Sequence, residues 1–175
     1  MSEICVISGI EMTFEAELAF ADQVGRHFAR HYGQPPMTGR VAGWLLICDP
    51  PQQTVAEIAD ALRASRSAVG TAISTLEQWS FVQRSRAAGE RADRVSADPS
   101  FGAQSLEAPA EYGALAALAR HGLATLSDQP PARRARLLEL AAFADFLLER
   151  MPAAAAEWRA RRDALRASGE LPDPS

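Results

Sequence analysis

A short run of hydroxyl and guanidinium side chains recurs at helical spacing near the middle of the chain. The residues are Arg66, Ser67, Thr71 and Ser74, and they share one side of a helix that we expect to run from Ser65 to Trp79. Short side chains allow close approach to a duplex, and hydroxyl and guanidinium groups can reach base edges or phosphates in a DNA major groove. We therefore predict that this face contacts nucleic acid.

Two capped helices separated by a tight turn are expected to position that face. Thr54 and Glu57 have the spacing of a capping box, and Ser65 is a candidate N-cap first and a DNA contact second. The apolar stripe of the second helix consists of Val69, Ala72, Ile73 and Leu76. The pattern predicts a helix-turn-helix. An ordinary helical hairpin is the alternative, because the turn at residues 63–64 lacks the frequent glycine.

A basic hairpin is expected directly after this second helix, from Val82 to Val95, with its turn at Ala88-Gly89. Four arginines line its arms: Arg84, Arg86, Arg91 and Arg94. A hairpin in this place is the wing of a winged-helix domain, whose tip can reach phosphate or the neighbouring minor groove. A solvated surface hairpin is the alternative for the same arginines.

The charge of the chain is unevenly distributed. The 175 residues carry a net charge of -4, and all 18 basic side chains are arginine. Between residues 63 and 98, six arginines stand against four carboxylates, which leaves a local charge of +2. Such a local excess supplies attraction to phosphate, while an acidic remainder limits indiscriminate binding.

Other function classes have little support in the sequence. It shows no nucleophile elbow, phosphate-binding glycine loop, zinc-ligand cluster or dinucleotide fingerprint, so we expect no enzyme and no cofactor. His27 and His31 could face one metal ion, but no carboxylate or cysteine pattern accompanies them, so we expect no metal. Cys5 and Cys48 are too few for a disulfide framework, and Cys48 is expected to be a structural thiol rather than a redox sensor. With no membrane span or leader expected, the chain is predicted to be cytoplasmic.

Further helices are expected on both sides of the basic region. One runs from Thr13 to about Tyr32, preceded by an arm that packs on the protein or a flexible tail over residues 1–11, and another runs from about Thr38 to Cys48. Beyond residue 99, one helix is expected over residues 112–126 and another from about Ala132. Pro152 should mark a kink or the first turn of a last helix.

The helix from Ala132 carries more apolar residues than one neighbouring helix would cover. Their alternating spacing of four and three predicts a self-complementary dimer interface, with burial inside the monomer as the alternative. The predicted interface consists of Leu137, Leu140, Ala141, Ala144, Leu147, Leu148 and Met151.

Residues 39–84, which read GRVAGWLLICDPPQQTVAEIADALRASRSAVGTAISTLEQWSFVQR, resemble the DNA-binding region of bacterial MarR-type regulators, specifically the GbsR-like branch. Residues 134–163 are similar to the C-terminal helices of that branch. The resemblance implies a winged-helix homodimer that represses transcription and releases DNA on binding a small molecule. It also implies an acidic residue and an arginine near the wing tip, where Glu90 and Arg91 stand, whereas Ala92-Asp93 departs from the usual density of basic residues in the second arm.

We therefore predict a mainly α fold with a small β-hairpin wing, in one compact chain. It comprises an N-terminal arm and helix over residues 1–36, a winged helix-turn-helix domain over 37–98 and a C-terminal helical dimerisation region over 99–175. The expected partners are double-stranded DNA, a second copy of the chain and a small-molecule effector.

The effector pocket is expected between the DNA-binding lobe and the dimerisation helices. Its candidate lining residues are Phe14, Trp44, Tyr112 and Phe143, each of which has burial in the core as the alternative. A winged-helix module that binds an acidic protein instead of DNA is the alternative function.

Overall fold

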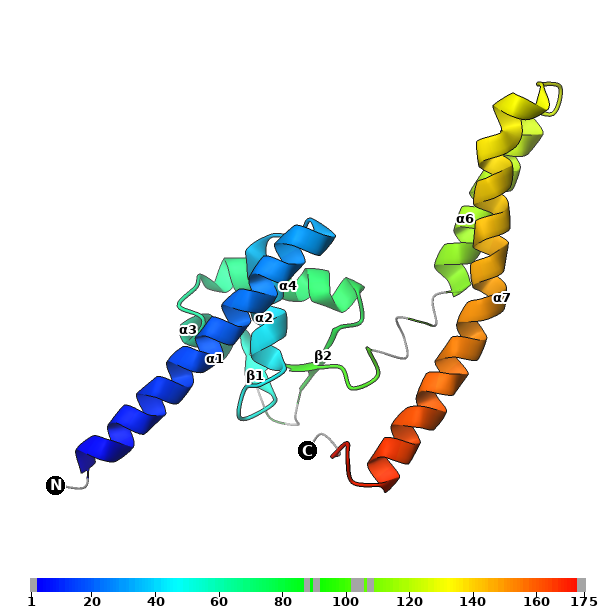
Figure 1. Cartoon of the computed structure of the whole chain (residues 1–175). Coiled ribbons are helices and arrows are strands. Elements are labelled where there is room, and N and C mark those ends of the chain that lie inside the picture. The colour runs from blue at the N-terminus through cyan, green and yellow to red at the C-terminus, as the bar shows by residue number, and fades with distance from the viewer. Residues whose placement is uncertain (1–2, 87–88, 90–91, 102–105, 107–108, 173–175) are drawn as a thin grey trace. The chain divides into compact units, whose positions relative to one another are not determined.

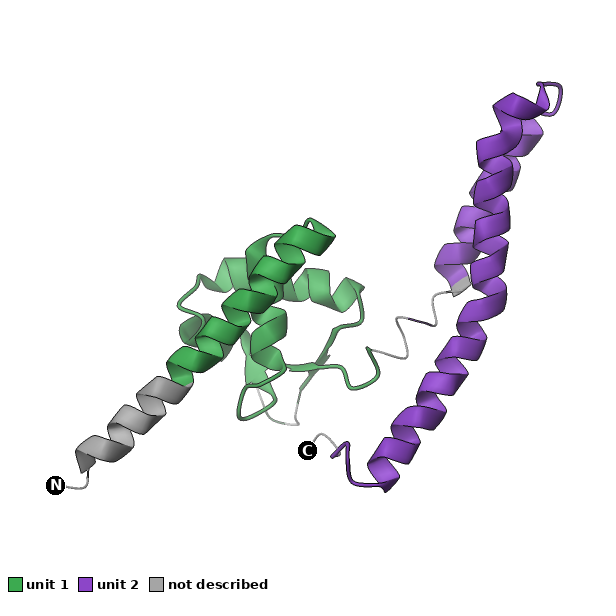
Figure 2. Ribbon diagram, viewed as in Figure 1, with its two compact units in different colours: residues 1–101, 175 green, residues 102–174 purple. Residues whose placement is uncertain are grey.

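The computed structural model describes residues 3–86, 89, 92–101, 106 and 109–172, with side chains described from Phe14 onward (Figure 1). Two compact units divide the chain, one over residues 1–101 and the other over residues 102–174 (Figure 2). The first unit contains α1 (Glu3–Tyr32), α2 (Pro36–Leu45), β1 (Gln53–Thr54), α3 (Val55–Ala61), α4 (Arg66–Gln78), β2 (Val82–Ser85) and β3 (Arg94–Ala97). The second contains α6 (Pro109–Thr125) and α7 (Pro131–Ala167).

Helix α1 begins ten residues earlier than the apolar periodicity predicted. It is helical from Glu3, so the flexible tail expected over residues 1–11 is wrong, while the packing of this segment as an arm stays a prediction. The segment contains no proline, and its one glycine, Gly9, is tolerated inside a helix at a cost of about 1 kcal/mol. The C-terminal end at Tyr32 agrees with the prediction, and Gly33 follows with a left-handed φ of +64°.

Helices α1 and α2 cross with their backbones in close approach, and glycine makes this approach feasible. A Cβ at Gly39 would lie 2.6 Å from the carbonyl oxygen of Val24 and 2.8 Å from the Cβ of Phe28. A Cβ at Gly43 would lie 2.9 Å from the side chain of Val24, and one at Gly25 would lie 2.8 Å from the side chain of Arg40. No other residue type fits at Gly39 without a backbone shift.

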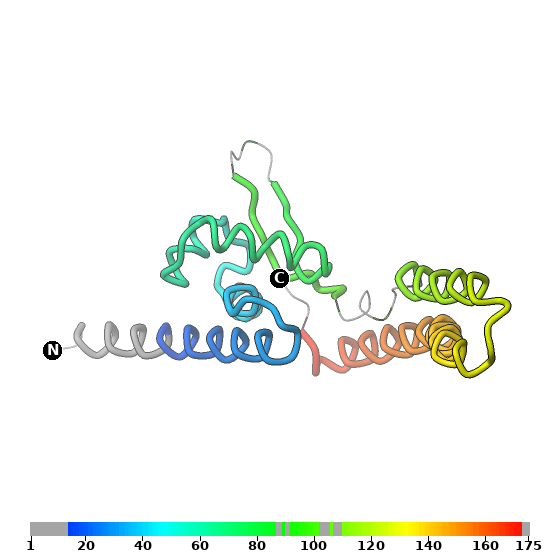
Figure 3. The backbone as a smooth tube through the Cα atoms, turned by 90° about the horizontal axis from the view of Figure 1, so that it is seen from above, coloured from blue at the N-terminus to red at the C-terminus, as the bar shows by residue number. Residues whose placement is uncertain are grey.

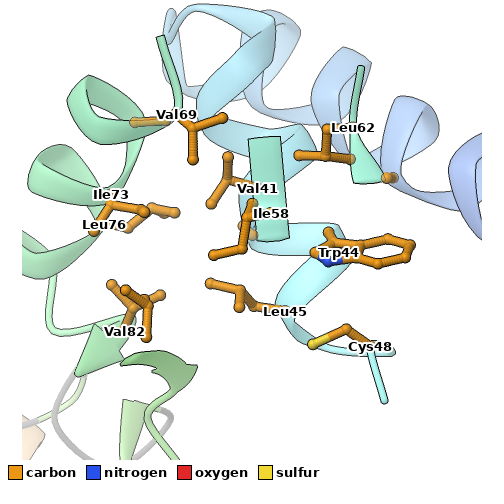
Figure 4. Close-up of a cluster of buried hydrophobic side chains, with 14 of the residues drawn as sticks. Val41, Trp44, Leu45, Cys48, Ile58, Leu62, Val69, Ile73, Leu76 and Val82 are labelled. Atoms are coloured by element: carbon orange, nitrogen blue, oxygen red, sulfur yellow. The ribbon is translucent and has the colours of Figure 1, made fainter. Parts of the chain in front are cut away.

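Helix α2 also contributes to the core of the unit, which includes Leu18, Ala21 and Phe28 of α1. Helix α2 lies between α1 and α4 (Figure 3). Its large side chains meet apolar residues of α3, α4 and β2 in one buried cluster that includes Val41, Trp44, Leu45, Cys48, Ile58, Leu62, Val69, Ile73, Leu76 and Val82 (Figure 4). The buried Trp44 Nε1 donates a 2.8 Å hydrogen bond to Gln53 Oε1, which satisfies two polar groups inside the core. Helix α2 covers Pro36–Leu45 rather than the predicted residues 38–48.

The hairpin predicted after α4 is present, within a three-stranded antiparallel sheet of order β1-β3-β2. Val82 pairs with Ala97 and Ser85 with Arg94, so the second arm extends two residues past the predicted end at Val95. The sequence pattern gave no sign of β1, whose two residues pair with Val95 and Arg94. Much of the expected turn lies outside the described residues, although Gly89 has a left-handed φ of +92°.

The second unit is a helical hairpin of α6 and α7 packed through small side chains. Ala116 and Ala119 of α6 and Ala141, Ala144 and Ala155 of α7 are buried. Helix α7 runs unbroken from Pro131 to Ala167 and contains Pro152, so the predicted start of a separate last helix there is wrong. Proline removes one backbone donor from a helix without necessarily ending it, since a long packed helix compensates for the loss.

The crossing of α1 and α2 generates a prediction about stability. Gly39→Ala should lower the free energy of unfolding by about 1–3 kcal/mol, because the added methyl group overpacks a backbone contact. Gly113→Ala is the matched control, since a Cβ there meets no atom within 4 Å. It should be neutral or stabilising by about 0.5–1 kcal/mol. Urea denaturation of both variants measures the difference, and equal stabilities would contradict the role given to Gly39.

Candidate nucleic-acid interface

The start of α4 has the local geometry that the sequence predicted. Ser65 has extended backbone angles, and its Oγ accepts a 3.1 Å hydrogen bond from the backbone N–H of Ala68. Helical residues then run from Arg66 to Gln78, with the predicted apolar stripe buried. A side-chain oxygen in this position satisfies one of the amides that a helix start leaves unpaired. The cap therefore fixes where α4 begins and which face it turns outward.

The outward face of α4 is polar and consists of short side chains apart from its first residue. Ser65, Arg66, Ser67, Thr71 and Ser74, the five residues predicted for the recognition helix, are all exposed. Thr71 Oγ1 donates to the Ser67 carbonyl and Ser74 Oγ donates to the Gly70 carbonyl, each at 3.1 Å. These two hydroxyl protons are thus held by the helix itself, while their oxygen lone pairs face outward as acceptors.

Gly70 lies in the middle of this face and has no packing role there. A Cβ at this position would meet no atom within 4 Å. Glycine inside a helix costs about 1 kcal/mol relative to alanine, and at Gly70 no contact within the described protein offsets that cost. The absence of a side chain instead lowers the surface between Arg66 and Ser74, which allows another molecule to approach the helix backbone.

The turn between α3 and α4 uses an arginine where glycine is frequent. Arg63 adopts a left-handed φ of 50°, and the N–H of the next residue, Ala64, donates to the Ala59 carbonyl at 2.9 Å. A non-glycine residue in this conformation is strained by about 1 kcal/mol or more. The Arg63 guanidinium donates to the carboxylate of Glu15 on α1 at 2.9 Å. The turn is thereby held in a helix-turn-helix geometry, although its sequence lacks the usual signal.

The wing arginines lie beside carboxylates, which the sequence analysis did not predict. Arg84 donates from Nε and Nη2 to the two oxygens of Glu77 at 2.7 and 3.0 Å. Arg86 Nε donates to Asp93 Oδ1 at 2.6 Å, and this hydrogen bond holds the pKa of Asp93 below its ordinary value. The predicted contact Arg91 and its neighbour Glu90 lie outside the described residues. The spacing of seven becomes a contact only in the fold, where the turn at residues 79–81 brings Arg84 to Glu77 and the hairpin brings Arg86 to Asp93.

Arg94 connects the sheet to the start of α3. Its Nη1 donates to the Gln52 carbonyl at 3.3 Å and lies 3.6 Å from Glu57 Oε2. Glu57 also completes the predicted capping box with Thr54, through hydrogen bonds of 2.7 and 3.2 Å. The backbone N–H of Thr54 is the main cause of a lowered pKa at Glu57. This geometry gives Arg94 a role in anchoring β3 to α3, and its predicted contact with DNA stays a prediction.

The described sulfur and imidazole groups are not arranged to bind a metal ion. His27 and His31 lie on the exposed side of α1 with ring centroids 4.5 Å apart. Among the described residues, no group of three or more histidine, cysteine or acidic side chains could hold a metal ion. Burial raises the pKa of the Cys48 thiol to about 11, which keeps it protonated and unreactive near neutral pH. The side chain of Cys5 lies outside the described residues. Among the described helices, none is long and apolar enough to span a membrane.

The seven residues predicted for the dimer interface divide into two groups. Ala141 and Ala144 are buried inside the α6–α7 hairpin, and Leu137 lies 3.0 Å from where a Cβ of Gly122 would be, so this part of the seam packs within the chain. The others, including Leu140, are partly exposed. The most exposed aromatic side chains of α7 are Phe143 and Phe146, at 53% and 54%.

The four residues predicted for an effector pocket are divided between the two units. In the first unit, Phe14 packs edge to face on the buried Trp44 with ring centroids 6.0 Å apart. In the second unit, Phe143 is exposed, and Tyr112 lines a cavity of about 290 Å³ with Leu147, Leu148 and Met151 of α7. Three predicted interface residues therefore face a cavity, and a pocket formed by all four aromatic residues stays a prediction.

Comparisons with known proteins identify the family to which this winged-helix fold belongs. The family described as MmpR5-like MarR family transcriptional regulator matches residues 101–161. The HTH-type transcriptional regulator MmpR5 of Mycobacterium tuberculosis is 36% identical over 124 residues, which cover 70% of this chain and 74% of that protein. A crystal structure of a transcriptional regulator superposes with a TM-score of 0.75 at 31% identity, covering 82% of this chain and 98% of that one. The GbsR-like branch is not confirmed. The chain belongs to the MarR family of winged-helix, DNA-binding transcriptional regulators.

Proposed function

We propose that the protein is a homodimeric repressor that binds a pseudo-palindromic operator and inserts one α4 helix into each of two successive major grooves. The observation that carries this proposal is the exposed face of α4, where Arg66 forms no hydrogen bond or ion pair with the described residues and Gly70 leaves the helix backbone accessible. An arginine with its donors unused at the start of a recognition helix fits bidentate binding to guanine O6 and N7. Repression follows if the operator overlaps a promoter.

Exposed apolar residues on the second unit support the homodimer. Phe143 and Phe146 of α7 are both more than half exposed, which is costly for two aromatic side chains so close on one helix. A second copy would bury them in a two-fold interface, where each protomer supplies the same residues. Two α4 helices related in this way would read half-sites about one helical turn, or roughly 10 bp, apart.

Arg66 and Gly70 provide the direct test of DNA recognition. Arg66→Gln should weaken binding to DNA upstream of the protein's own gene by about 1–3 kcal/mol and change the preferred sequence. Gly70→Ala should stabilise the fold by up to about 1 kcal/mol yet weaken binding, because its methyl group occupies the face that approaches the bases. Fluorescence anisotropy and urea denaturation measure the two effects. The proposal fails if the wild-type protein binds no upstream fragment in a salt-dependent way.

A reporter gene distinguishes repression from activation. With the wild-type promoter fused to the reporter, Arg66→Gln should raise expression because the operator is left unoccupied. Lower expression with this variant would contradict the repressor assignment. It would not contradict the proposal that the protein binds DNA.

Substitutions at Ser65 separate capping from DNA contact. Ser65→Ala should lower the free energy of unfolding by about 1 kcal/mol, whereas Ser65→Asp should preserve it, because an aspartate caps a helix as well as a serine. Ser65→Asp should still weaken DNA binding, because it adds a negative charge near the phosphates. Unchanged DNA affinity in Ser65→Asp would place the start of α4 away from the duplex.

The dimer is tested by placing charges on the exposed aromatic residues. The double substitution of Phe143 and Phe146 by glutamate should give a folded monomer in analytical ultracentrifugation, because two carboxylates cannot be buried unpaired in an interface. Leu46→Glu is the control, since Leu46 is 56% exposed on the first unit and should leave the mass unchanged. A double variant that remains dimeric would rule out this face of α7.

A further inference from the structure

The described arginines of the helix-turn-helix and wing are mostly paired with carboxylates. Arg63 pairs with Glu15, Arg84 with Glu77, Arg86 with Asp93 and Arg94 with Glu57. Arg66 forms no such pair within the described part of the chain. Among the described arginines of this region, Arg66 is therefore the one that phosphate could reach without competition from a carboxylate.

The pair of Arg84 and Glu77 has the strongest geometry. The guanidinium meets the carboxylate side-on through two hydrogen bonds of 2.7 and 3.0 Å, and both side chains are about one-third exposed, at 34% and 33%. Arg84 lies two residues after the buried Val82 on β2. The side chains of Val82 and Arg84 therefore lie on the same face of the sheet, which packs against α4. The pair thus joins the root of the wing to the last turn of the recognition helix.

The pair of Arg86 and Asp93 lies further along the wing, across its two arms. Its atoms are 2.6 Å apart, and the side chains are 57% and 35% exposed. Exposed ion pairs of this kind add little to stability because solvent screens them, so the fold gains little from either pair. Their electrostatic effect is larger, because a carboxylate in direct contact cancels most of the field of the guanidinium toward a distant phosphate.

We propose that Glu77 and Asp93 determine the DNA selectivity of the protein by neutralising Arg84 and Arg86. This inference rests on the proposed binding of α4 to DNA. Neutralisation of the two arginines keeps the sequence-independent attraction to phosphate weak. Contacts from the α4 face then contribute a larger share of the binding energy, which raises the ratio of operator binding to non-specific binding.

The experiment measures binding of the full-length protein to a 30-bp duplex of random sequence over a series of salt concentrations. Glu77→Gln and Asp93→Asn remove the charge but keep the shape and one hydrogen-bond acceptor for the arginine. Each should steepen the dependence of log affinity on log salt by about 0.9 per protomer and tighten binding at 0.1 M salt by about fivefold to tenfold per protomer. The double variant should show the sum of the two changes in slope.

The control is Asp145→Asn, which breaks an exposed pair with Arg120 in the second unit and changes the net charge by the same amount. It should leave the salt dependence as in the wild type, and thermal melts confirm that all variants fold. An unchanged slope in both wing variants, weaker binding, or an equal effect of Asp145→Asn would overturn the proposal. Failure of the wild-type protein to bind any duplex overturns the proposed function instead.

Discussion

The close crossing of α1 and α2 is the constraint on which the first unit depends. Gly39 and Gly43 remove side chains from one side of α2, so its backbone rests directly on α1 at Val24. Helix α2 can then direct Val41 and Leu45 into the core that holds α4, while Trp44 packs against Phe14 of α1. Since four apolar residues of α4 are fixed in that core, its polar residues have only one direction left, which is toward solvent. The orientation of the exposed α4 face therefore depends on the packing of α1 against α2.

The same unit shows which parts of a fold can be predicted from sequence. The caps at Thr54 and Ser65 were predicted correctly because a cap depends on residues three positions apart along one chain segment. Strand β1 was missed because two residues carry no periodicity and become a strand only by pairing with β3. The ion pairs were missed for a related reason. Glu77 and Arg84 belong to different elements, and only the turn at residues 79–81 brings them together.

The C-terminal helices show a different limit. The spacing of four and three correctly identified an apolar face on α7, but periodicity cannot state which surface covers that face. Ala141 and Ala144 are buried within the chain against α6, while Phe143 and Phe146 remain exposed. Small residues suit the close approach of two helices in one hairpin, whereas the large exposed aromatic residues would gain most from burial by the proposed second copy. Residue size, added to spacing, separates the two kinds of contact.

In the proposed binding mode, different side chains of α4 offer hydrogen-bond donors and acceptors to DNA. The hydroxyl protons of Thr71 and Ser74 are held by carbonyls of their own helix, so these side chains meet a base mainly as acceptors, which suits the amino groups of adenine and cytosine. Arg66 has only donors, which suits guanine. The neutralised pairs of Arg84 and Arg86 add little attraction to any sequence. In the proposed mode, a duplex that presents the wrong pattern would lose base contacts without compensation from phosphate, so weak non-specific attraction would add to the selectivity of base reading.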